Sequence, residues 1–281
     1  MTDAINFHDA SIDEILSLDR IRATLQRMEE TIVFRLIERT QYAHNPLVYQ
    51  EGAFAELRDK EGWSGSWLTW VIKETESSYA KLGRWLAPDE HPFTPMDQLP
   101  PPLLTPQDYP SILHPHHVNV SHEILDFYTS DVVPVITNRM HRSTDDRQYG
   151  SAAVCDTEAL SAISRRIYFG MFVSESKFRA DPGAFIPHIQ SRNTEALAGL
   201  ITKPAVEQVL LQRVGQKAEV YGQNLDPVTH GNANLRKIQS QDIVRLYQEY
   251  IIPLTKKVEV DYLLERLDGL SQEDIKQLVH S

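Results

Sequence analysis

The chain has 281 residues, a length that suits one large domain or two. Its 28 Lys and Arg stand against 39 Asp and Glu, so the net charge is -11, which argues against binding to nucleic acids or anionic membrane surfaces. Cys155 is the single cysteine, which excludes an internal disulfide and fits a reducing compartment.

The N-terminal segment MTDAINFHDASIDEIL is acidic and lacks the basic and apolar regions of a secretory signal. It also holds too few arginines for a typical transit peptide, and no apolar run in the chain approaches the roughly 20 residues of a membrane span. We therefore expect a soluble, cytoplasmic protein.

Helical periodicity dominates the first half of the chain. Ser11 and Glu14 form a capping box ahead of apolar positions that recur to Leu36, which predicts a first helix of about thirty residues. Residues 42–62 are predicted as a loop and 64–86 as a helix. The segment 88–119 is rich in proline and predicted as a long connection, after which a helix is expected over 122–140.

The second half is predicted as a series of helices separated by short connections. Asp156 is expected to cap a helix that begins near Glu158, and Pro204 is well placed as the first residue of another. The predicted helices are 158–178, 182–190, 194–201, 204–221, 240–267 with a kink at Pro253, and a tail helix capped by Ser271 and Asp274.

No sustained strand alternation and no internal repeat occur in the sequence. We therefore predict an all-α fold of about ten to twelve helices in a single domain over residues 1–281. Its core is expected over about 11–267, and the tail helix lies within 268–281.

One predicted helical face carries two cations among apolar positions. Steps of three and four residues place six positions on it: Ala159, Ile163, Arg166, Gly170, Val173 and Lys177. Unpaired buried charge is very costly, so these cations require an anionic partner. The residues alone leave open whether that partner is a protein carboxylate or a bound anion.

Four further residues have side chains suited to a polar site. Arg22 lies on the first predicted helix, and Glu207 lies near the start of the helix that begins at Pro204. Thr255 and Glu259 are four residues apart and so share one face of the last long helix. The apolar neighbours of Glu259 predict partial burial, which raises the pKa of a carboxyl group and lets it donate a hydrogen bond.

Other candidate motifs are weaker. His114, His116 and His117 lie in a proline-rich segment without a cysteine or carboxylate framework, which makes a zinc site improbable there. No phosphate-binding loop, dinucleotide fingerprint or nucleophile elbow occurs, and Cys155 is interpreted as structural rather than nucleophilic. The sequence thus predicts neither a metal nor a cofactor.

Four ordered blocks resemble the allosteric chorismate mutases of fungi and plants: IRATLQRMEETIVFRLIERTQY, YGSAAVCDTEALSAISRRIYFGMFVSESKF, KAEVYG and IIPLTKKVEVDYLLERL. The resemblance runs from about Leu18 to Leu267. It implies an all-helical homodimer that converts chorismate to prephenate without a cofactor, is inhibited by tyrosine and is activated by tryptophan.

The resemblance also implies roles for six residues, all of which keep the identity of the family. Arg22 and Arg166 match active-site arginines, and Arg166 would grip a substrate carboxylate. Lys177 would contact the ether oxygen and a carboxylate. Glu207 would hold the substrate hydroxyl, Thr255 would lie beside the ligand, and Glu259 would face the ether oxygen. Lys203 replaces a lining asparagine.

The effector positions implied by the resemblance are only partly retained. Arg84, Gly150 and Ser151 match the family, whereas Gly83 replaces an arginine and Val154 a threonine. Gln148 belongs to the same segment, and Gln239 takes the helix-entry position tied to activation. We expect weakened tyrosine inhibition, and the response to tryptophan stays open.

Two alternatives compete with the enzyme interpretation. One is a non-catalytic helical dimer that binds aromatic amino acids or a protein partner. The other is a plain helical scaffold in which carboxylates such as Glu29 neutralise the cationic face. Retention of all six site identities favours the enzyme. Because Glu259 would face the ether oxygen in its protonated form, we expect the activity to fall as pH rises through the pKa of Glu259.

Overall fold

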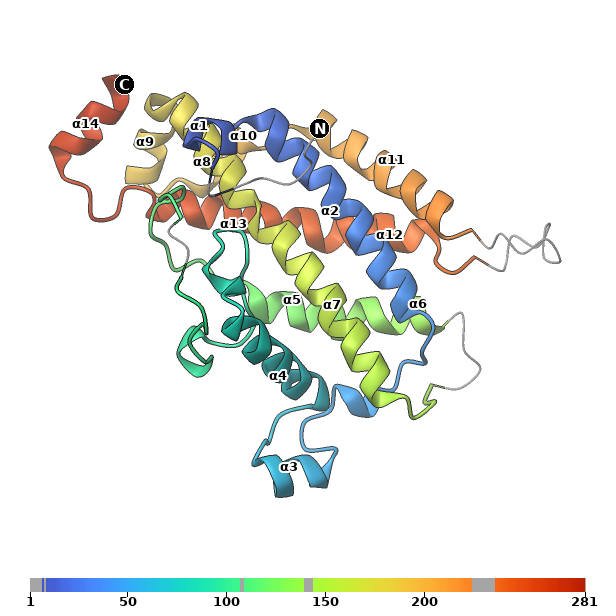
Figure 1. Cartoon of the computed structure of the whole chain (residues 1–281). Helices are drawn as coiled ribbons and strands as arrows, with labels where there is room; N and C mark the ends of the chain where they lie inside the picture. The colour runs from blue at the N-terminus through green and yellow to red at the C-terminus, as the bar shows by residue number, and fades with distance from the viewer. Residues whose placement is uncertain (1–6, 8, 107–108, 139–143, 224–235, 281) are drawn as a thin grey trace.

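The computed structural model describes residues 7, 9–106, 109–138, 144–223 and 236–280 (Figure 1). These residues form helices and connecting segments, and none of them belongs to a β-strand, which confirms the predicted all-α class. No helix among the described residues is long and apolar enough to cross a membrane.

Two long helices, α2 (Leu18–Arg39) and α7 (Tyr149–Tyr168), lie side by side along the molecule (Figure 1). The α11 helix (Pro204–Tyr221) flanks α2, and α12 (Ser240–Leu246) leads into α13 (Ile252–Glu265), which packs on α7. Ile32, Ile163 and Val258 come from α2, α7 and α13 and are fully buried in the main core. This core fixes the helices that carry the predicted site residues.

A second apolar core lies beyond the end of α7. It joins α13 to α8 (Gly170–Ala180), α9 (Pro182–Gln190) and α10 (Thr194–Ile201), and Ile275 of α14 (Gln272–His280) closes it. The predicted helices at 182–190, 194–201 and 204–221 are confirmed. The predicted tail helix is confirmed as α14. Its predicted cap is present as well, because the Ser271 hydroxyl accepts a hydrogen bond from the backbone N–H of Asp274.

The prediction of one helix from Ser11 to Leu36 and beyond is wrong. The capping box of Ser11 and Glu14 is present, but it begins only the short α1 (Ile12–Ile15), and α2 restarts at Leu18. Ile15 and Leu16 are both buried in an apolar cluster with Phe172. Ser17 has an extended backbone (φ -60°, ψ 121°), so the helix is interrupted between this buried pair and Leu18.

The loop predicted over residues 42–62 contains two helical pieces, η1 (Pro46–Val48) and α3 (Ala55–Glu61). The helix predicted over 64–86 is shorter, with α4 (Trp67–Lys81) capped by the Ser66 hydroxyl and followed by η2 (Arg84–Leu86). α3 escaped prediction because it buries a single side chain, Leu57, and so has little apolar periodicity. Among its described residues, the proline-rich segment holds one helical piece, η3 (Met96–Gln98).

Two helices pass through π-helical turns just before a proline. α5 (Ser121–Phe127) joins α6 (Val133–Asn138) through residues 128–132, and α12 joins α13 through residues 247–251. Pro134 and Pro253 each lack a backbone N–H and crowd the carbonyl four residues earlier, so a local widening of the helix accommodates them. The predicted kink at Pro253 is therefore a π-helical turn that leads directly into the segment of Thr255 and Glu259.

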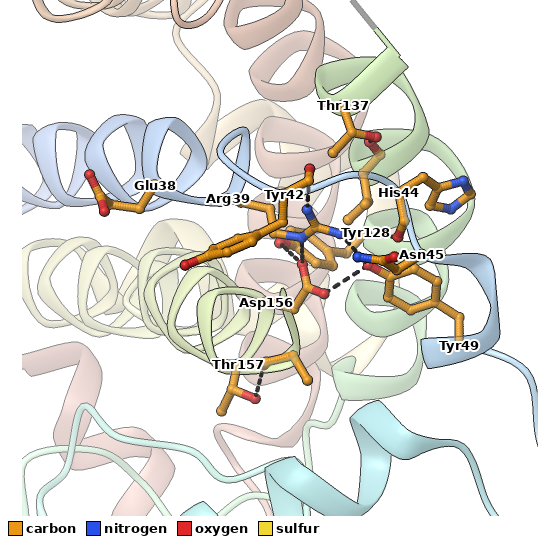
Figure 2. Close-up of polar contacts among 12 residues, drawn as sticks. Glu38, Arg39, Tyr42, His44, Asn45, Tyr49, Tyr128, Thr137, Asp156 and Thr157 are labelled. Atoms are coloured by element: carbon orange, nitrogen blue, oxygen red, sulfur yellow. Dashed lines mark hydrogen bonds and ion pairs between the residues drawn. The ribbon is translucent and has the colours of Figure 1, made fainter. Parts of the chain in front are cut away.

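The prediction that Asp156 caps a helix that begins near Glu158 is wrong, because α7 begins at Tyr149, nine residues before Glu158. Figure 2 shows Asp156 inside the protein, where its carboxylate accepts hydrogen bonds from Arg39 Nε at 2.7 Å, Tyr128 at 2.8 Å and Tyr49 at 2.8 Å. Arg39 is also fully buried and donates to the carbonyls of Tyr42, Ala43 and His44. Every polar group of the pair has partners, which lets it join α2 to α7 within the core.

Candidate active site

All six predicted site residues line one cavity of about 180 Å³. Arg22 reaches it from α2, Arg166 from α7, Lys177 from α8 and Glu207 from α11, while Thr255 and Glu259 reach it from α13. The remaining wall is mainly apolar and includes Ile21, Leu25, Val173, Val206 and Ile252, and Lys203 also faces the cavity. Five helices, α2, α7, α8, α11 and α13, thus place polar groups around one mainly apolar cavity.

The cationic face lies where the sequence predicts it. Ala159, Ile163 and Gly170 are buried, and Arg166 and Lys177 both line the cavity, although Phe169 separates α7 from α8. Arg166 is only 4% exposed, and its Nε and Nη1 atoms have no hydrogen-bond partner. Two buried guanidinium donors without an acceptor are suited to a ligand carboxylate.

The Lys177 ammonium group is half-buried and donates a hydrogen bond to the backbone carbonyl of Ile201. Burial lowers the pKa of Lys177 most, the charges of Lys203 and Arg22 lower it further, and the charge of Glu259 partly opposes them. This ammonium group therefore lies among other cations, in a place that a bound anion would stabilise.

Glu259 is 8% exposed, and burial raises the pKa of its carboxyl group to about 8. The charges of Lys177, Arg166 and Lys256 reduce this shift, whereas the charge of Glu207 adds to it. Glu259 is therefore mainly protonated at neutral pH and is able to donate a hydrogen bond into the cavity.

Two cations at the rim of the cavity are paired with carboxylates. Lys256 Nζ lies 2.8 Å from Glu207 Oε1, and Arg22 Nη1 lies 3.0 Å from Asp19 Oδ1. Lys256 was missed by the sequence analysis because it follows Thr255 directly and so lies on a different side of α13. Its long side chain nevertheless brings the ammonium group to the cavity.

Close packing of α8 on α13 depends on Gly170. A Cβ atom at that position would lie 2.9 Å from Thr255 Cγ2 and 3.0 Å from Glu259 Cγ. The hydroxyl group of Thr255 donates to the Ile251 carbonyl at 2.6 Å, and Ser174 Oγ donates to the Glu259 carbonyl at 3.1 Å. These contacts fix the part of α13 that faces the cavity.

Glu29 does not neutralise the cationic face, as the scaffold alternative requires. It is fully buried and is held by Arg213 at 2.6 Å and Lys217 at 3.2 Å. The unpartnered nitrogens of Arg166 remain. The observation therefore favours a bound anion over an internal carboxylate as the partner of Arg166.

A second cavity, of about 200 Å³, lies between α2, α4, η2 and α7. It brings together two of the predicted effector positions, Arg84 and Val154, and also includes Trp85 and Ser161. The Arg84 guanidinium donates to Glu90 and Ser161.

The other predicted effector positions do not line this second cavity. Gly150 and Ser151 lie in the first turn of α7, directly after Gln148, and are exposed. Gly83 precedes η2 with a φ of 80°, and Gln239 precedes α12.

The histidine motif makes protein contacts. His114 contacts the Asp268 carbonyl, His116 packs edge-on against Tyr262, and His117 pairs with Glu265. Across the described residues, no group of three or more His, Cys, Asp or Glu is arranged to hold a metal ion. Burial raises the pKa of the Cys155 thiol, and Asp156 and Glu158 raise it further, which makes it a poorer nucleophile.

No protein-family model matches the chain. Among curated proteins, the chorismate mutase of Emericella nidulans is 40% identical over 277 residues, which cover 97% of this chain and 100% of that protein. Chorismate mutase 3, chloroplastic, of Arabidopsis thaliana is 41% identical over 260 residues, 91% of this chain and 79% of that protein.

Solved structures give the same result. The Candida albicans chorismate mutase in complex with L-Trp has a TM-score of 0.89 and 39% identity, covering 98% of this chain and 100% of that one. AtCM1 with tyrosine bound in its allosteric site has a TM-score of 0.76 and 40% identity, covering 91% of this chain and 98% of that one. The resemblance of the four sequence blocks is confirmed, and the chain belongs to the all-helical chorismate mutase family of fungi and plants.

Proposed function

We propose that the cavity between α2, α7, α8, α11 and α13 binds chorismate and rearranges it to prephenate. The observation that carries this proposal is the buried, unpartnered Arg166 guanidinium beside the Lys177 ammonium and a Glu259 carboxyl with a pKa of about 8. A dianionic substrate supplies the acceptors that Arg166 lacks, and the apolar wall matches its ring.

Catalysis in this proposal needs no nucleophile and no proton transfer. Arg166 and Arg22 hold the two carboxylates and so keep the flexible substrate folded in a reactive conformation. Negative charge then develops on the ether oxygen as its bond breaks. The Lys177 ammonium and the protonated Glu259 carboxyl stabilise that charge, Glu207 accepts the substrate hydroxyl, and Thr255 lies beside the ligand.

Arg22 and Glu207 must change partners when substrate enters. In the described structure Arg22 pairs with Asp19 and Glu207 pairs with Lys256, both at partly exposed positions. Exposed ion pairs contribute about 0–1 kcal/mol, so a dianion exchanges them at little cost. Lys256, once released from Glu207, adds a further cation beside the substrate.

The test is the loss of chorismate absorbance with purified protein and with two variants. Arg166→Ala is expected to abolish turnover, whereas Arg58→Ala, which removes an exposed arginine on α3, is expected to leave it unchanged. Absence of turnover by the folded wild-type chain at acid and neutral pH would instead support the non-catalytic alternative.

Regulation by aromatic amino acids is proposed for the region around Arg84 and Val154. The replacements Gly83 and Val154 remove groups suited to read the tyrosine phenol, whereas Arg84, Gly150 and Ser151 are suited to an amino-acid backbone. We expect tyrosine to inhibit weakly, and we expect Val154→Thr to strengthen that inhibition. The φ of 80° at Gly83 disfavours an arginine there. Strong inhibition of the wild type by micromolar tyrosine would refute this expectation. The same assay measures the response to tryptophan.

A homodimer is proposed on the basis of exposed apolar side chains near the end of α4. Leu82 is 75% exposed, and Leu103 and Leu104 are 76% and 79% exposed on an adjoining segment. Apolar surface of this kind is typical of a subunit interface. Sedimentation of the wild type and of Leu82→Asp tests this assignment, and a cytoplasmic location remains a prediction.

A further inference from the structure

The two helices that carry Lys177 and Glu259 run in the same direction along their contact. Gly170 at the start of α8 packs on Thr255, and Ser174 Oγ, one turn later, bonds the Glu259 carbonyl. The register between α8 and α13 therefore decides how far the Lys177 ammonium lies from the Glu259 carboxyl.

A third link between these helices involves the turn of α13 that follows Glu259 and the residue Glu175 of α8. Glu175 of α8 is fully buried, and its carboxylate accepts a hydrogen bond from the Tyr262 hydroxyl at 2.6 Å. It also accepts two hydrogen bonds from the Arg266 guanidinium, from Nε at 2.6 Å and from Nη2 at 3.1 Å. Burial alone would raise the pKa of Glu175, but the hydrogen bonds from Arg266, Tyr262 and Arg179 lower it below its ordinary value. The group is therefore an ionised carboxylate held by fork-like donors, which have strict geometry.

This link continues the catalytic face of α13. Thr255, Glu259, Tyr262 and Arg266 follow one another at spacings of four, three and four residues, so they share one side of the helix and its extension. On α8, Glu175 precedes Lys177 by two residues. The clamp made by Glu175, Tyr262 and Arg266 thus connects the helical turns that hold the two catalytic groups.

The proline-rich segment closes the clamp from outside. The backbone N–H of His114 donates to Tyr262 Oη at 2.9 Å, which orients the phenol hydroxyl toward Glu175. Three residues later the backbone N–H of His117 donates to Glu265 at 2.7 Å. The segment therefore fixes the C-terminal end of α13 in addition to connecting two helices.

We propose that Glu175 is a positioning residue of the mutase, which acts through Tyr262 and Arg266 to set the distance between the Lys177 ammonium and the Glu259 carboxyl. This inference rests on the proposed roles of Lys177 and Glu259. Arg179 also bonds Glu175, but it lies on α8 itself, so it does not bridge the two helices.

Glu175→Gln tests the inference, and Arg179→Met is its matched control. The Gln side chain keeps the volume but accepts fewer charged hydrogen bonds, so the register relaxes. A misplacement of about 1 Å costs on the order of 100-fold in rate, so we expect kcat to fall at least roughly tenfold with a smaller change in KM. Arg179→Met is expected to leave kcat within about twofold of the wild type.

The pH profile separates positioning from a loss of stability. The groups that act on Glu259 are Lys177 on α8, Arg166 on α7, Lys256 on α13 and Glu207 on α11. Withdrawal of Lys177 removes a cation that lowers the pKa of Glu259. Activity is expected to decline at alkaline pH as Glu259 loses its proton, and we call this decline of kcat/KM the alkaline limb. Glu175→Gln is therefore expected to move the alkaline limb to higher pH, which a purely structural role would not do.

Two further variants keep the test decisive if Glu175→Gln fails to fold. Tyr262→Phe removes one hydroxyl group and is expected to shift the limb in the same direction by a smaller amount. Glu175→Met with Arg266→Met removes both charges without leaving either one unpaired, and it is expected to fold with low activity.

Wild-type kcat and an unmoved limb in folded Glu175→Gln, or in Tyr262→Phe if the first variant does not fold, would overturn the inference. Full activity of the double methionine variant would do the same. A wild-type chain without turnover would refute the proposed function itself, so the two failures remain distinct.

Discussion

The pH dependence of kcat/KM gives the sharpest prediction, because one carboxyl group must stay protonated for catalysis. In the unliganded protein the pKa of Glu259 is raised to about 8, chiefly by burial. An ionised Glu259 would repel the ether oxygen on which negative charge develops. Activity is therefore expected to decline as pH rises through about 8.

The size of the decline follows from the fraction of neutral carboxyl. With a pKa of about 8, the protonated fraction of Glu259 is about nine-tenths at pH 7 and about one-tenth at pH 9. We therefore expect kcat/KM to fall roughly tenfold between these two pH values. Because a bound dianion disfavours a second negative charge, the corresponding limb of kcat is expected at higher pH.

Glu259→Gln identifies the responsible group. The amide is neutral at every pH and still donates a hydrogen bond, so the limb near pH 8 is expected to disappear. A residual decline at higher pH is expected from Lys177, because burial lowers the pKa of its ammonium group below 10.5. The assay is initial-rate loss of chorismate absorbance between about pH 5 and 10, with folding monitored by circular dichroism.

Two results would refute this reasoning. One is a profile for the wild type that stays flat across pH 6–9, and the other is a limb that survives unchanged in Glu259→Gln.

Stability provides an independent check on the same pKa. The raised folded-state pKa of Glu259 stabilises the protein fully below about 4.5, and this contribution is lost as pH rises toward about 8. Glu259→Gln should remove that part of the pH dependence of unfolding.

Two structural predictions concern the packing that holds the site. Gly170→Ala brings a methyl group within 3.0 Å of Thr255 and Glu259, so we expect about 1–3 kcal/mol of destabilisation and a clear loss of kcat; an unchanged melting temperature with full activity would contradict it. Asp156→Ala leaves the buried Arg39 charge without its carboxylate (Figure 2), so we expect the free energy of unfolding to fall by about 3–5 kcal/mol. Urea unfolding measures this change, and a decrease below about 1 kcal/mol would contradict the prediction.

Much of the site could be predicted from sequence because it lies on regular helices. Helical spacing put Arg166 and Lys177 on one face and Thr255 above Glu259, and all four line the cavity. Periodicity alone could not show that α2 and α11 would bring Arg22 and Glu207 to the same space. Their residue types marked both as candidates, but only the resemblance to a family assigned them to the same site as Arg166 and Lys177.

The errors arose where tertiary contacts overrode local signals. Asp156 has the chemistry of a helix cap, but its partner Arg39 lies 117 residues away, so no local pattern could reveal the buried pair. Lys256 and Glu175 sit beside recognised residues, and their importance depends on the neighbouring helices that they reach. The two π-helical turns insert an extra residue that a fixed helical period cannot anticipate.

A crystal structure with prephenate bound would test the central claim most directly. We predict that the product lies in the cavity between α2 and α13, with one carboxylate on Arg166 and with Lys177 and Glu259 beside the atoms of the broken ether bond. Prephenate in another cavity, or in this one without contact to Arg166, would contradict the assignment of the active site.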